Sequence, residues 1–152
     1  MLRPSGAFAI TVGSCSLVVA SAGDVTLTAT YAGDGTFAAS SDTESHTVAA
    51  PSLRLRTQPD KVKSGEPFKH PPEVQLVSAN GTELKREGVT VRVSVVSGLG
   101  TLVGATSVST DDNGRAKFGD LALVGLPGSY VLRFEADGFL PVDSNPIDLR
   151  LR

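Results

Sequence analysis

The sequence is poor in the residues that usually mark catalytic, redox or membrane proteins. It has no Trp, one Cys, one Met and two His among 152 residues, and aromatic residues make up 5% of it. One Cys excludes a disulfide framework within the chain, and one Cys with two His is too few for a Cys/His metal site. No apolar run reaches the ~18 residues that a membrane-spanning helix needs. A net charge of −2 without a basic excess argues against nucleic-acid binding.

Alternation of apolar and polar residues dominates the rest of the sequence. It runs through 25–31, 89–96 and 130–137. A period of two places one row of side chains in a core and the other in solvent, which is typical of β-strands. Turn-forming groups of Gly, Asn, Asp and Pro separate these segments, and none has helical periodicity. The pattern predicts an all-β sandwich.

The chain also repeats itself. When Gly23 is placed on Gly128, Gly33 falls on Gly138, and both copies read as an alternating strand, a Gly turn, a polar loop and a final strand. We therefore expect two tandem β-sandwich modules, the N-terminal one truncated.

The expected domains are a partial module over 1–50, which holds only C-terminal strands, and a complete module over 51–152. The junction is short and contains Pro51, so it should be fairly stiff. Strands of the first module are expected near 6–12, 15–20, 24–31 and 43–49. Those of the second are expected near 52–57, 73–78, 89–96, 101–109, 115–123, 129–136 and 146–151.

Tyr130 has two interpretations. Its place at the start of the penultimate strand, after Leu126-Pro127-Gly128-Ser129, resembles a tyrosine corner, in which the hydroxyl hydrogen-bonds to backbone just upstream. Alternatively, Tyr130 simply fills the core and finds some other hydroxyl partner.

Three segments resemble bacterial immunoglobulin-like (Ig-like) repeats. "AGDVTLTATYAGDGTFAASSDTESHTV", residues 22–48, is similar to the end of such a repeat. "STDDNGRAKF", 109–118, and "LRLRTQPDKVKSGEPF", 53–68, resemble a turn and a first strand of the Big, or invasin-like, group. The resemblance implies that the two tandem modules are Ig-like β-sandwiches of a secreted or surface protein, but it says little about function.

The N-terminal segment 1–22 could be either a signal peptide or strands. Ala20-Ser21-Ala22 fits a signal-peptidase site and Val12-Gly13-Ser14-Cys15 a lipobox, but Gly13-Ser14 splits the apolar run. The resemblance favours strands, because related repeats carry a similar Gly-Ser-Cys segment before the alternating strand. It also implies that this Cys pairs with a second Cys on the adjacent upstream strand. That second Cys is absent from this sequence.

No catalytic group emerges from the candidate residues. Cys15, His46 and His70 form no nucleophile–base pattern with a third, orienting residue. Cys15 is expected to be a small apolar residue or half of a lost disulfide.

Calcium ligands are also not expected. Asp111, Asp112 and Asn113, or Asp34 with Asp24, offer oxygens but lack the spacing of a one-loop calcium site. Asp-Asn-Gly is better explained as a hairpin turn. We expect no catalytic, cofactor-binding or metal-binding residues and no cofactor.

Five basic residues of the second module could form a patch, but acidic residues balance them, so we expect a solvated face. They are Lys61, Lys63, Lys69, Lys85 and Arg86.

The expected function is that of a non-catalytic spacer, such as an adhesin stalk, in an extracellular or cell-surface bacterial protein. The alternatives are a glycan- or protein-binding module and an accessory module of a secreted hydrolase. For partners, we expect self-association through the incomplete first module and neither nucleic acid nor a membrane span.

Overall fold

The computed structural model describes residues 22–151. The chain divides into two compact units, Met1–Ala49 and Ala50–Arg152, called here the first and second units. The described residues form thirteen strands and no helix, which confirms the all-β class. They accordingly contain no helix that could cross a membrane. The strands expected near 6–12 and 15–20, the signal-peptide alternative and Cys15 lie outside the described residues.

In the first unit, the described residues form an antiparallel hairpin of β1 (Gly23–Tyr31) and β2 (Ser40–Val48). Its register runs from Gly23 opposite Val48 to Tyr31 opposite Ser40. Val25 and Leu27 are half-buried, whereas the rest of β1 is exposed. The strand predicted near 24–31 is confirmed, and the next strand begins three residues earlier than predicted.

The second unit contains the remaining strands. They are β3 (Ser52–Thr57), β4 (Val62–Lys63), β5 (Glu73–Val77), β6 (Thr90–Ser97), β7 (Gly100–Val103), β8 (Ser107–Ser109), β9 (Arg115–Lys117), β10 (Ala122–Gly125), β11 (Gly128–Glu135), β12 (Val142–Asp143) and β13 (Ile147–Arg150).

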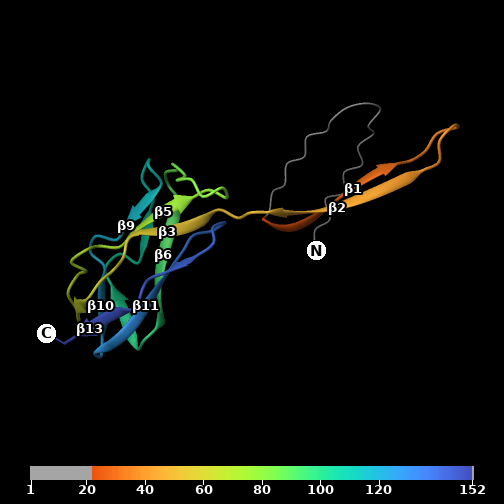
Figure 1. Ribbon diagram of the computed structural model, residues 1–152. Coiled ribbons are helices and arrows are strands. Elements are labelled where there is room, and N and C mark those ends of the chain that lie inside the picture. Colours follow the sequence, from red (N-terminus) through yellow and green to blue (C-terminus); the bar gives the residue numbers. More distant parts are fainter. Residues whose placement is uncertain (1–21, 152) are drawn as a thin grey trace. The chain divides into compact units, whose positions relative to one another are not determined.

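These strands build a sandwich of two main sheets (Figure 1). One sheet has the order β3-β5-β9, the other β4-β13-β11-β6-β8 with β12 added beside β11, and β7 pairs with β10 separately. Leu76 and Ala116 enter the core from the first sheet, and Val91, Leu132 and Phe134 enter it from the second. The alternation predicted over 89–96 and 130–137 therefore does place one row of side chains in a core, whereas over 25–31 no side chain is more than half-buried.

Two predicted strands, 101–109 and 115–123, are wrong as continuous elements, because each changes sheets midway. The first splits into β7 and β8, and the second into β9 and β10. At the first break Gly104 has a φ of +94°, and a Cβ there would lie 2.3 Å from the carbonyl oxygen of Asp120. Asp120 Oδ1 accepts a hydrogen bond from the Ala105 amide at 3.2 Å, which fixes this crossing.

Tyr130 satisfies both of its interpretations. The residue is only 2% exposed and belongs to the core. Its hydroxyl lies 2.8 Å from the carbonyl oxygen of Leu126, four residues upstream, which confirms the tyrosine corner. It also lies 3.0 Å from the carbonyl oxygen of Leu99, so the same group ties two loops together.

Candidate functional site

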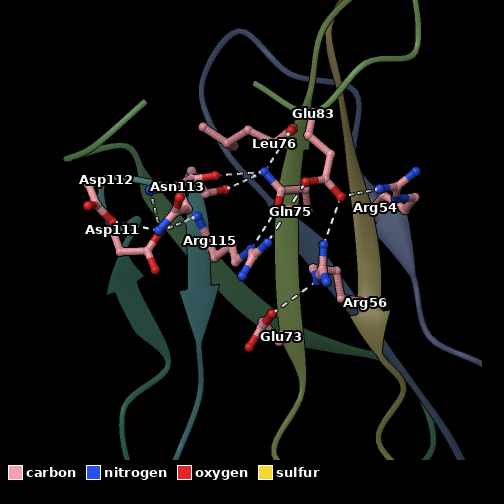
Figure 2. Close-up of polar contacts among 11 residues, drawn as sticks. Arg54, Arg56, Glu73, Gln75, Leu76, Glu83, Asp111, Asp112, Asn113 and Arg115 are labelled. Atoms are coloured by element: carbon pink, nitrogen blue, oxygen red, sulfur yellow. Dashed lines mark hydrogen bonds and ion pairs between the residues drawn. The ribbon is translucent and has the colours of Figure 1, made fainter. Parts of the chain in front are cut away.

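The densest group of polar contacts lies on the outer face of the β3-β5-β9 sheet, and Figure 2 shows it in close-up. Glu83 is at its centre. Its Oε1 accepts hydrogen bonds from Arg54 Nη2 at 2.9 Å and from Arg56 Nη1 at 2.7 Å. Arg56 Nε also lies 3.3 Å from Glu73 Oε1. We call this group, with Gln75 and Arg115, the polar face.

Gln75 is the most unusual residue of the polar face, because its side chain is polar and completely buried. Its Nε2 lies within hydrogen-bond distance of the carbonyl oxygens of Leu76, Asn113 and Gly114, at 3.1, 3.0 and 3.3 Å. Its Oε1 accepts a hydrogen bond from Arg115 Nε at 3.1 Å. Both ends of the amide are thus satisfied, as a buried polar group requires.

The polar face therefore connects the strands of the β3-β5-β9 sheet through side-chain contacts. Glu83 engages two arginines of β3, and Gln75 on β5 holds the turn before β9. Side chains of the ion pairs around Glu83 are 35–51% exposed, so each pair adds little to stability. The group contains guanidinium, carboxylate and amide functions but no hydroxyl, thiol or amine, and its guanidinium groups already have partners.

The sequence reasoning missed Gln75 and Glu83 altogether. A signal for Gln75 exists, since it interrupts the otherwise apolar run Val74-Gln75-Leu76-Val77. Glu83 carries no such signal, because its role depends on a hairpin that places it opposite Val77.

The acidic residues that could have bound calcium use their oxygens for turns instead. Asp111 Oδ1 accepts hydrogen bonds from the amides of Asn113 and Arg115, both at 2.9 Å. Asn113 Nδ2 donates to Asp112 Oδ1 at 2.8 Å. These bonds favour the interpretation of this segment as a turn.

Asp24 and Asp34 lie near opposite ends of β1, so they do not form one site. Asp24 lies at the start of β1, where its Oδ1 accepts a hydrogen bond from Thr47 Oγ1 at 2.7 Å. Asp34 lies past the other end of β1, and its Oδ1 accepts bonds from the amides of Thr36 and Phe37, both at 2.8 Å. Those two amides lower the pKa of Asp34.

The histidines form surface pairs with carboxylates. His70 Nδ1 lies 2.9 Å from Asp60 Oδ2, and His46 Nε2 lies 3.5 Å from Glu44 Oε2. The two pairs belong to different units. The five basic residues of the expected solvated face, Lys61, Lys63, Lys69, Lys85 and Arg86, are all exposed. Residues 22–151 contain no group of three or more His, Cys, Asp or Glu arranged to hold a metal ion.

A shallow hollow of about 250 Å³ lies elsewhere on the second unit. Its lining includes Arg86, Val89, Arg92, Asp137 and Phe139. Arg92 Nη1 lies 3.4 Å from Asp137 Oδ1, and Phe139 supplies an apolar wall.

Two packed antiparallel-rich sheets and a tyrosine corner define the second unit as an Ig-like β-sandwich. The family described as SMCHD1 Ig-like domain 6 matches residues 46–148, and the chain belongs to that family. No curated protein matches the chain. The expected Ig-like class is confirmed, whereas this match does not extend to the bacterial Big, or invasin-like, group.

Proposed function

We propose that the chain is a non-catalytic spacer, made of tandem Ig-like modules, in a secreted or cell-surface protein. The observation that carries this proposal is the pairing of β4 with the last strand, β13. The two strands are parallel, with Val62 opposite Leu149 and Lys63 opposite Arg150. The Ser64 amide adds a hydrogen bond of 2.8 Å to the Arg150 carbonyl oxygen.

Parallel pairing suits a module that bears tension along the chain. The N-terminal side of β4 leads back toward the start of the unit, and the C-terminal side of β13 leads to its end. Pulling the ends apart therefore slides the two strands along each other. All their hydrogen bonds are then strained together, which resists force better than breaking them one after another.

The pairings of both units support the tandem arrangement. β1 pairs with β2 so that Gly23 lies opposite Val48, and β11 pairs with β13 so that Gly128 lies opposite Leu149. Gly33 and Gly138, which the sequence repeat superposes, have φ values of +84° and +82°. The resemblance of residues 22–48 to bacterial repeats supports the surface location and a bacterial source.

Stretching the full chain by its ends tests the spacer proposal. The second unit should unfold in one step of about 30–35 nm, from ~3.4 Å per residue of extended chain. Ser64→Pro removes the amide that donates to the Arg150 carbonyl oxygen at the β4–β13 pairing and should lower the unfolding force sharply. Ala116→Gly in β9, which weakens the core outside the load path, is the control. The proposal is contradicted if the two substitutions lower the unfolding force in the same proportion to the folding free energy that each removes.

A binding module is the second candidate function, because Phe139 and two arginines line the hollow. Screening the full chain against glycans and acidic peptides would test it. Arg92→Ala should abolish any binding through the hollow, whereas Arg150→Ala, outside its lining, should preserve it. Binding that survives Arg92→Ala would exclude the hollow as the site.

A further inference from the structure

One edge of the second unit lacks charged side chains and Pro, two of the features that keep sheet edges apart. Among the described residues β7 pairs with β10 and with no other strand. The far side of β10 is occupied, because its neighbours Leu121 and Leu123 accept hydrogen bonds from the amides of Phe68 and Gly65. β7 is therefore the open side of this pair.

The sequence around β7 carries no charge that would discourage pairing. Residues 93–110 contain no Asp, Glu, Lys, Arg, His or Pro. Exposed edges normally carry charged side chains or Pro, which prevent other strands from adding. The edge strand β9 follows this rule with Arg115 and Lys117, as does β4 with Lys63.

Large apolar side chains surround the open edge. Leu99 is 87% exposed, Val103 54%, Val124 39% and Leu126 70%. Val124 lies opposite Thr101 and Val103 opposite Ala122, so Val103 and Val124 share one face of the β7–β10 pair. We call these four residues, with β7, the apolar edge.

The apolar edge is held rigidly by the tyrosine corner. The carbonyl oxygens of Leu99 and Leu126 both lie within hydrogen-bond distance of the Tyr130 hydroxyl, at 3.0 and 2.8 Å. Two loops that present the most exposed leucines are thus fixed to one buried ring. A surface that is already ordered costs less entropy to bury than a mobile one.

We propose that the apolar edge is a self-association site, at which β7 of a second copy adds antiparallel to β7. Antiparallel pairing of two identical strands creates a two-fold axis, the symmetry of most dimers. An uncharged edge is also complementary to itself, because neither copy brings a charge that would be left unpaired. The paired edges join the two β7–β10 pairs into one four-stranded sheet and cover the exposed leucines and valines of both copies.

Sedimentation of the full chain from about 1 to about 100 µM tests the proposal, a range that covers weak specific association. The wild type should form dimers, and Val103→Lys and Leu99→Lys should each weaken them roughly tenfold or more. Leu140→Lys is the matched control, because Leu140 is 55% exposed but lies outside the apolar edge. It should leave the dimer intact.

Hydrogen exchange provides a second measurement that does not depend on a substitution. Amides of residues 100–103 should gain protection as the concentration of the wild-type chain rises. A chain that stays monomeric over the whole range would overturn the proposal. So would a dimer that survives Val103→Lys but is lost on Leu27→Asp, because that result would place association in the β1–β2 hairpin. Neither result bears on the spacer function.

Discussion

Buried polar side chains, rather than charged groups, hold the less regular parts of the second unit. Tyr130 joins two loops through one hydroxyl, and Gln75 joins β5 to the turn before β9 through one amide. The hydrogen bonds of these two side chains replace the bonds to water that burial removes. Removing either polar group therefore leaves its buried partners unsatisfied. The ion pairs around Glu83 lie nearer the surface, where water screens them.

Tyr130→Phe should lower the free energy of unfolding by about 1 kcal/mol, the net value of a buried hydrogen bond. The ring remains, so the loss reports on the hydroxyl alone. Urea denaturation of the full chain measures it. Tyr31→Phe is the control, because Tyr31 is 40% exposed, and it should change stability little. A loss below a few tenths of a kcal/mol for Tyr130→Phe would show that its hydroxyl bonds contribute nothing.

Gly114→Ala and Gly81→Ala should differ in cost although both glycines follow Asn and have positive φ, +73° and +85°. A Cβ at Gly114 would lie 1.9 Å from the Leu84 carbonyl oxygen, whereas a Cβ at Gly81 would meet nothing within 4 Å. Gly81→Ala should therefore cost about 1 kcal/mol, from backbone strain alone. Gly114→Ala should cost at least about 2 kcal/mol more, since the turn must also shift. Equal midpoints in urea denaturation would contradict the steric argument.

At the scale of elements, the short strands are defined by their neighbours. β12 has only two residues, Val142 and Asp143, and lies beside β11. Arg133 of β11 meets Asp143 with two hydrogen bonds, Nε to Oδ1 at 2.7 Å and Nη2 to Oδ2 at 2.8 Å. The Arg133 guanidinium holds the pKa of Asp143 below its ordinary value.

Asp143→Asn should destabilise the chain at neutral pH but not in acid. Because the folded-state pKa of Asp143 is lowered, its stabilising effect is present above the unfolded-state pKa, about 3.9. It is lost as the pH falls through the folded-state pKa. Urea denaturation of both chains across this range should show the difference in stability closing as the pH falls. On an Arg133→Gln background the difference should be small at every pH, and a difference that persists there would exclude the pair as its cause.

At the scale of the whole chain, the two units differ in how much core they contain. The buried apolar residues all lie in the second unit, among the described residues. The described part of the first unit is one hairpin with two half-buried apolar side chains, Val25 and Leu27. The second unit therefore has the means to fold by itself, whereas this hairpin needs other residues.

Residues 50–152 expressed alone should unfold cooperatively, because both main sheets contribute to one core and ~100 residues is the usual size of such a sandwich. Denaturant unfolding followed by fluorescence and by circular dichroism tests this. Coincident transitions are expected. A broad, non-cooperative transition would mean that the first unit is needed for folding.

Residues 1–50 alone should not persist as a folded monomer. A two-stranded hairpin is marginal in water, and a chain of ~50 residues buries little surface. Each large apolar side chain that stays exposed would forfeit about 1.5–3 kcal/mol of the folding free energy that its burial provides. Light scattering and hydrogen exchange of this fragment can decide. A monomer with strongly protected amides over 24–31 would show that the first unit is complete enough to fold.

The sequence by itself determined the all-β class and most long strands, and it offered the tyrosine corner as one of two interpretations of Tyr130. Alternation indicates which side chains face a core, whereas the hydroxyl bonds of Tyr130 to the Leu126 and Leu99 carbonyl oxygens became evident only in the structure. Only the tertiary structure decided that the chain passes to another sheet at Gly104, that Gln75 is buried, and that β7 is left at an open edge. These features depend on contacts between segments far apart in the sequence, such as Gly104 with Asp120 and Gln75 with Asn113. A period of two residues along one strand carries no information about which strand will lie beside it.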